Sequence, residues 1–126
     1  MLKTVLVADD DAIVRAAVRV AFEHDNCFSV CEAVDGQDAI EKARQLKPDL
    51  IVLDFSMPRM NGIDAARILA QEMRLVPLVL FTMHSLEIMG SSAREVGFKA
   101  VISKDQGTLG LVTQCQTLLE ALSPRR

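Results

Sequence analysis

The stretch PDLIVLDFSMPRMNG occupies residues 48–62 and decides how the rest of the chain is interpreted. Its apolar run Leu50–Leu53 is short and uninterrupted, which predicts a buried β-strand. Asp54 follows at once, and a loop then leads to a helix expected from about Ile63 to Glu72. Pro fixes φ and Gly permits positive φ, so Pro58 and Gly62 favour a shaped loop. The stretch therefore predicts a unit in which a strand delivers an acid to a loop before a helix.

The same alternation of apolar runs and amphipathic segments continues on both sides of this unit. It predicts further strands at Leu2–Ala8, Phe28–Ala33, Pro77–Thr82 and Ala100–Ser103. It predicts helices at Ala12–Glu23, from a cap at Asp35 to about Leu46, from a cap at Ser85 to Gly97, and at about Thr108–Leu122. Strict alternation of this kind predicts an α/β protein with a parallel sheet covered by helices on both faces.

Helical periodicity assigns faces to these predicted helices. We expect Arg15, Arg19 and Glu23 to form the solvent face of the first one. Inward-facing stripes are expected at Ala39, Ile40, Ala43 and Leu46, and at Leu111, Cys115, Leu118 and Leu122. The run Gly90–Ser92 is a poor helix sequence, which predicts a loosely held first half of the helix at about Leu86–Val96.

Size and composition limit the functional classes. The chain has 126 residues, which favours one domain spanning 1–126, and a net charge of −3, which argues against a nucleic-acid surface. The longest apolar stretch, Leu75–Met83, is too short to span a bilayer, and the N-terminus lacks a signal-peptide layout, so we expect a cytoplasmic protein. The cysteines Cys27, Cys31 and Cys115 form no CxxC pair and are expected to be mostly buried, reduced thiols.

Polar residues follow four of the predicted strands. Asp9-Asp10-Asp11 follows the first, Asp54 the third, Thr82 ends the fourth, and Lys104 follows the fifth. Ligands of open parallel sheets bind beyond the carboxyl ends of the strands, so these groups are expected to meet in one crevice. Clustered carboxylates repel one another, and Mg²⁺ prefers their oxygen atoms as ligands. A carboxylate can also attack phosphorus, with a lysine and a hydroxyl stabilising the phosphoryl oxygens. Asp11 also fits the simpler role of a helix cap.

Two stretches resemble a known family in sequence and in order. Val5–Asp11 and residues 48–62, together with Thr82 and Lys104, are similar to the motifs of response-regulator receiver domains of bacterial two-component systems. The resemblance implies a flavodoxin-like, doubly wound five-stranded parallel sheet with strand order 2-1-3-4-5 and about five helices.

The resemblance also implies roles for individual residues. Asp54 would accept a phosphoryl group from a sensor histidine kinase or a phosphotransfer protein, and the domain would be a switch rather than an enzyme, with slow autodephosphorylation. Asp9, Asp10, Asp54 and the backbone carbonyl of Ser56 would bind Mg²⁺ or Mn²⁺. Thr82 and Lys104 would contact the phosphoryl group.

Two positions depart from the family pattern. Val101 stands three residues before Lys104, where the family usually carries an aromatic residue that turns inward after phosphorylation. Asp105 follows Lys104, which resembles receivers that precede a helix-turn-helix domain. We therefore expect the signal to pass through the backbone after Thr82. The helix at about Leu86–Val96, the next strand and the final helix would form the output surface and a candidate homodimer face.

Three other functions compete with this one. A phosphorylation-independent interaction domain with the same fold is favoured by Val101 but not by the intact acidic residues. An aspartyl phosphatase would need a second acid where Ser56 stands. A flavin carrier is disfavoured because the chain has no Trp or Tyr. His84 could transfer protons at the rim of the site, although a solvated loop histidine is the simpler interpretation.

Overall fold

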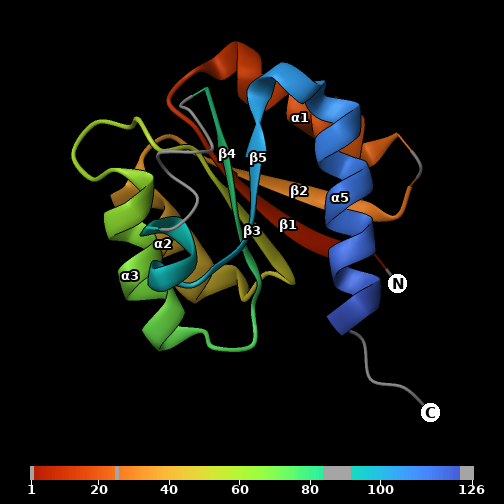
Figure 1. Ribbon diagram of the computed structural model, residues 1–126. Coiled ribbons are helices and arrows are strands. Elements are labelled where there is room, and N and C mark those ends of the chain that lie inside the picture. Colours follow the sequence, from red (N-terminus) through yellow and green to blue (C-terminus); the bar gives the residue numbers. More distant parts are fainter. Residues whose placement is uncertain (1, 25, 84–91, 123–126) are drawn as a thin grey trace.

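Five parallel strands form one sheet at the centre of the computed structural model, which describes residues 2–24, 26–83 and 92–122 (Figure 1). The strands are β1 (Lys3–Ala8), β2 (Phe28–Ala33), β3 (Leu50–Leu53), β4 (Leu78–Thr82) and β5 (Phe98–Ser103). Their order is β2-β1-β3-β4-β5. The predicted flavodoxin-like sheet is therefore confirmed, including its strand order.

Helices cover both faces of this sheet, as Figure 1 shows. The helices are α1 (Ala12–Glu23), α2 (Gly36–Leu46), α3 (Gly62–Glu72), the short 3₁₀ helix η1 (Lys104–Gln106) and α5 (Gly107–Leu122), and residues 92–96 are also helical. One apolar core joins the sheet to α1 and α5, and a second joins it to α2 and α3. Strand β3 is buried along its whole length, which explains its unbroken apolar run.

Local signals explain where the helices begin and end. The side chain of Asp11 accepts a hydrogen bond from the backbone of Ile13, at 2.9 Å, and starts α1. Asp35 and Asn61 act in the same way at the starts of α2 and α3. Gly97, with a φ of 127°, follows the helical residues 92–96, as predicted.

The predicted solvent face of α1 is confirmed only in part, because the side chains of Arg19 and Glu23 are 38% and 39% exposed but that of Arg15 is only 14% exposed. Arg15 and Arg19 turn toward strand β2, where their Nε atoms lie 3.0 and 2.7 Å from the carboxylate of Glu32. The exposed positions of α1 also include Ile13 and Val20. The long arginine side chains lie along the edge strand because Glu32 offers them a carboxylate there.

Smaller corrections concern the ends of elements. Leu46 and Leu122 are exposed because each is the last residue of its helix, so the predicted inward stripes are shorter than expected. Strand β5 begins at Phe98 rather than Ala100, because an irregular register opposite Leu78 lets Phe98 join the sheet. Cys115 is buried, and burial raises the pKa of its thiol to about 12, whereas Cys27 is exposed, against expectation.

Some predictions lie outside the described residues. These are the cap at Ser85, the position of His84, and most of the weak segment Gly90–Ser92. Within the described ranges, none of the helices combines the length and the apolar character needed to cross a membrane.

Candidate functional site

Asp9 and Asp54 lie at the same level on neighbouring strands. Ala8 of β1 is in register with Leu53 of β3, so the next residue of each strand points into the same region. The backbone N–H of Asp54 donates to the carbonyl of Ala8 at 3.0 Å, and that of Asp9 donates to Ala33 at 3.1 Å. These bonds continue the sheet hydrogen bonding past the strand ends and fix both aspartates.

Three carboxylates meet at this edge of the sheet. One carboxylate oxygen from each of Asp9, Asp10 and Asp54 lies within 4.8 Å of the others. Asp9 and Asp54 are buried, at 3% and 7% exposure, whereas Asp10 is exposed. The backbone N–H of Asp11 donates to Asp9 Oδ1 at 2.9 Å, so Asp11 supports the cluster only through its main chain.

Lys104 bridges the two buried carboxylates. Its Nζ lies 2.8 Å from Asp9 Oδ2 and 3.3 Å from Asp54 Oδ1, and the side chain is largely buried. Burial lowers the pKa of Lys104, but the hydrogen bond to Asp9 and the charge of Asp54 outweigh it and hold this pKa above its usual value. The ammonium therefore stays charged and offsets part of the cluster's negative charge.

Among the acids of the described residues, Asp54 has a strongly raised pKa. Burial, and then the negative charge of Asp9, raise its pKa to about 6, against the opposing pull of Lys104. Functional sites often contain a titratable group whose pKa is shifted by both burial and a specific charged neighbour. The geometry thus distinguishes Asp54 from the surface acids of the chain.

Thr82 and Ser56 are the two remaining residues of the predicted site. Thr82 is buried at the end of β4 and is paired with Ser103, directly before Lys104. Ser56 lies two residues after Asp54 in the loop between β3 and α3, where its side chain is exposed. The structure thus brings Asp9, Asp10, Asp54 and Lys104 together, whereas Ser56 has an exposed side chain in the loop that follows Asp54.

Two arginine contacts were not predicted from the sequence. Arg15 Nη1 donates to the backbone carbonyl of Asp9 at 2.6 Å, and Arg59 contacts the buried carboxylate of Asp35. Arg15 lies one turn into α1, where a long side chain points back toward the preceding loop, and this was the available signal. Nothing in the sequence alone pairs Arg59 with Asp35.

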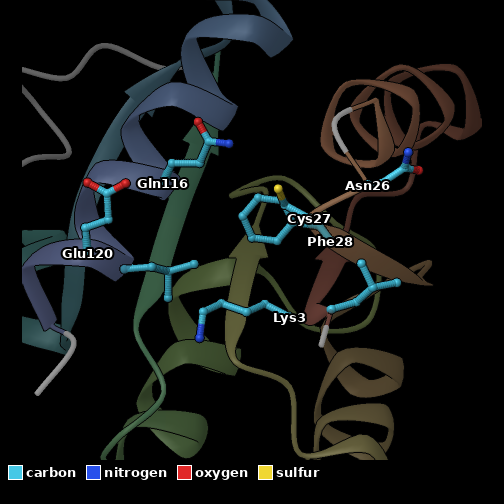
Figure 2. A pocket seen from close by; sticks show the side chains of 8 residues that line it. Lys3, Asn26, Cys27, Phe28, Gln116 and Glu120 are labelled. Carbon is cyan, nitrogen blue, oxygen red and sulfur yellow. The ribbon is translucent and has the colours of Figure 1, made fainter.

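The donor set suits a hard divalent cation. The three groups offer carboxylate oxygens only, which Mg²⁺ and Mn²⁺ prefer, and the cluster remains negative after Lys104 is counted. A separate hollow of about 560 Å³ lies at the opposite end of the sheet (Figure 2). Its lining includes Lys3, Cys27, Phe28 and Glu120 and none of the clustered aspartates. Among the described residues, the group of acids that could hold a metal ion therefore lies at the edge that contains Asp54.

Comparison with known proteins shows the family of this chain. The sequence model of the response regulator receiver domain matches residues 5–116, and the chain belongs to this family. Receiver domains are signalling domains of two-component systems, generally not enzymes, and they bind Mg²⁺ at an acidic pocket. They interact with histidine kinases or phosphotransfer proteins.

The relatives show what the chain is similar to. It is 38% identical over 102 residues to the transcriptional regulatory protein PdtaR of Mycobacterium tuberculosis, covering 81% of this chain and 49% of PdtaR. It is 31% identical to the regulator SphR of Synechococcus elongatus, covering 91% of this chain and 48% of SphR. The chain thus spans about half the length of these curated relatives.

Solved structures agree with the fold. A LuxR-family response regulator from Aurantimonas is 28% identical, covers 96% of this chain and 87% of its own, and has a TM-score of 0.89. The response regulator domain of Thermotoga maritima CheB is 28% identical, with a TM-score of 0.79 over 97% of this chain and 94% of its own.

Proposed function

We propose that Asp54 accepts a phosphoryl group from the phosphohistidine of a sensor histidine kinase or a phosphotransfer protein, and that the domain signals through this modification. The observation that carries the proposal is the group of three carboxylates within 4.8 Å, two of which share the ammonium of Lys104. We also propose that this takes place in the cytoplasm.

Asp9, Asp10 and Asp54, with the backbone carbonyl of Ser56, would hold Mg²⁺ or Mn²⁺. When bound, the cation would supply the positive charge that lets a phosphoryl group approach an acidic cluster. Lys104 supplies part of that charge from the protein itself, because its Nζ already contacts Asp54.

The chemical step is a displacement at phosphorus. The Asp54 carboxylate attacks, an O–P bond forms, and the P–N bond to the donor histidine breaks, after which the released imidazole nitrogen takes up a proton from solvent. Lys104 then pairs with the transferred phosphoryl group, and the Thr82 hydroxyl donates a hydrogen bond to one of its oxygens. Slow hydrolysis of the acyl phosphate at this open edge would return the domain to its resting state.

The test is phosphorylation by a small donor. Incubation with acetyl phosphate and Mg²⁺ should add one phosphoryl group to the intact mass, and Asp54→Asn should abolish the addition. Asp11→Asn is the matched control. Asn and Asp cap helices equally well, and Asp11 lies outside the carboxylate cluster. Equal labelling of wild type and Asp54→Asn, or full labelling in excess chelator, would refute the proposal.

Val101 favours a second function, that of an interaction domain that does not depend on phosphorylation. This side chain is half-buried in β5 and has no ring to turn inward. In the first function, the output surface and candidate homodimer face would comprise the helix that contains residues 92–96, together with β5 and α5. Sedimentation with and without beryllofluoride distinguishes the two functions. A change in association supports the switch, and an association state that beryllofluoride does not change supports the second function.

A further inference from the structure

The loop between β3 and α3 is fastened to the start of α2. The backbone N–H of Gly36 donates to the carbonyl of Met60 at 3.1 Å. The two backbones lie so close that a Cβ at position 36 would come within 2.4 Å of that carbonyl oxygen. Only glycine permits this approach, so the contact depends on the residue type at position 36.

An ion pair reinforces the same contact. The Asp35 carboxylate is 1% exposed, and both Nε of Arg59, at 2.9 Å, and its Nη2 donate to Oδ2. The backbone N–H of Asp38 donates to Oδ1 at 2.8 Å. The Asp38 hydrogen bond, and then Arg59, hold the pKa of Asp35 below its usual value despite burial. Asp35 is therefore a charged group whose counter-charge comes from the loop.

Arg59 adopts an uncommon backbone conformation to reach Asp35. Its φ is 66°, in the left-handed region that residues other than glycine rarely occupy. Such a conformation persists only where surrounding contacts determine it. The ion pair and the Gly36–Met60 hydrogen bond are contacts of that kind.

The other end of the loop is fixed beside Asp54. The backbone N–H of Gly62 donates to the carbonyl of Phe55 at 2.9 Å, and a Cβ at position 62 would lie 2.1 Å from the carbonyl oxygen of Asp54. Ser56 lies between the two fixed points. The loop that carries the proposed carbonyl ligand is thus held at Asp54 and at Asp35.

We propose that Asp35 and Arg59 form a positioning pair that fixes the loop following Asp54 and so sets the affinity of the site for a divalent cation. The inference rests on the proposed function, because it assumes that a backbone carbonyl of the loop completes the ligand set. Groups that orient metal ligands typically change metal affinity about 10- to 100-fold when they are removed.

A second ion pair offers a matched control. Arg44 of α2 donates to both carboxylate oxygens of Glu72 at the end of α3, at 2.7 and 2.6 Å. Like Arg59–Asp35, this pair links the α2 region to the unit that follows β3, but it lies at the opposite ends of the helices. Arg44→Ala therefore removes an equivalent interaction without touching the loop.

The experiment is a Mg²⁺ titration of wild type, Arg59→Ala and Arg44→Ala, in which the amide NMR signals report binding. We expect Arg59→Ala to bind Mg²⁺ about tenfold more weakly and Arg44→Ala to bind it like wild type. Arg59→Lys should recover part of the affinity. Exchange of the Gly36 amide, which reports the hydrogen bond to Met60, should quicken in Arg59→Ala only.

The possible outcomes distinguish the positioning role of Asp35 and Arg59 from the proposed function. Equal Mg²⁺ affinity of wild type and Arg59→Ala, or an equal loss in Arg44→Ala, would overturn the positioning role and leave the proposed function standing. A wild type that binds no Mg²⁺ would overturn both. If Arg59→Ala fails to fold, the same Mg²⁺ titration is made with Asp35→Asn and Arg59→Lys. Asp35→Asn keeps the hydrogen-bond acceptor for the backbone of Asp38.

Discussion

Replacing Asp54 with Asn should make the metal-free domain more stable at neutral pH. The folded protein holds this carboxylate against burial and against the charge of Asp9, which raises its pKa from 3.8 to about 6. Each pKa unit corresponds to about 1.4 kcal/mol, so the charged form costs up to about 3 kcal/mol in the folded state. The site opens to water at one edge, which reduces the expected gain for Asp54→Asn to about 1–2 kcal/mol.

The pH dependence follows from the sign of this shift. As pH rises, the unfolded chain releases the Asp54 proton near pH 4, whereas the folded protein keeps it until about pH 6. The contribution of Asp54 to the free energy of unfolding therefore decreases between about pH 4 and 6 and stays low above that range. Asp54→Asn lacks this decrease, so the stability difference between the proteins should vanish below pH 4.

The assay is urea unfolding in chelator at pH 4, 5, 6 and 7.5, followed by circular dichroism because the chain has no Trp or Tyr. The free energy of unfolding of Asp54→Asn should exceed that of wild type by about 1–2 kcal/mol at pH 7.5. Mg²⁺ at about ten times its Kd should restore about 1.4 kcal/mol to wild type and less to the variant. An Asp54→Asn protein that is less stable than wild type at pH 7.5, or a difference independent of pH, would refute the reasoning.

Three further predictions concern neighbouring residues. Asp10→Ala should fold normally, because its side chain is exposed, and should bind Mg²⁺ at least about tenfold more weakly in a calorimetric titration. Lys104→Met should still unfold cooperatively but should lose the amide-shift changes that phosphorylation causes, because the phosphoryl group would lack its ammonium partner; outright unfolding would show that the lysine is mainly structural. Gly36→Ala should cost about 1–3 kcal/mol of stability, measured by urea unfolding, because its Cβ would meet the Met60 carbonyl; a neutral effect would contradict the close contact.

The sheet could be predicted because its strands are buried on both faces. Continuous apolar runs such as Leu50–Leu53 carry that signal directly, and the structure has this strand and Phe28–Ala33 with the predicted ends. The meeting of Asp9 with Asp54 was predictable for a related reason, since parallel strands end at one edge and adjacent strands share a register. The strand order itself came from the resemblance to a family and not from periodicity.

The ion pairs could not be predicted in the same way. Helical periodicity treats Arg15 as a solvent-facing residue, because it counts charge as exposed and cannot see Glu32 on the adjoining edge strand. Arg59 and Asp35 lie 24 positions apart, and their contact depends on a loop conformation with a positive φ at a residue other than glycine. Patterns in sequence report burial well, but they report the partners of long charged side chains poorly.

The ionisation of Asp54 shows why the ammonium of Lys104 belongs at the centre of this site. A protonated carboxyl is a poor nucleophile, and burial together with the Asp9 charge drives Asp54 toward that form. With its pKa held to about 6, Asp54 is mostly ionised at pH 7 even without a metal. Lys104 is the cation that opposes the rise, through its 3.3 Å contact with Asp54. In the proposed reaction, the lysine would therefore keep Asp54 charged before a phosphoryl group arrives, and the same ammonium would pair with that group afterwards.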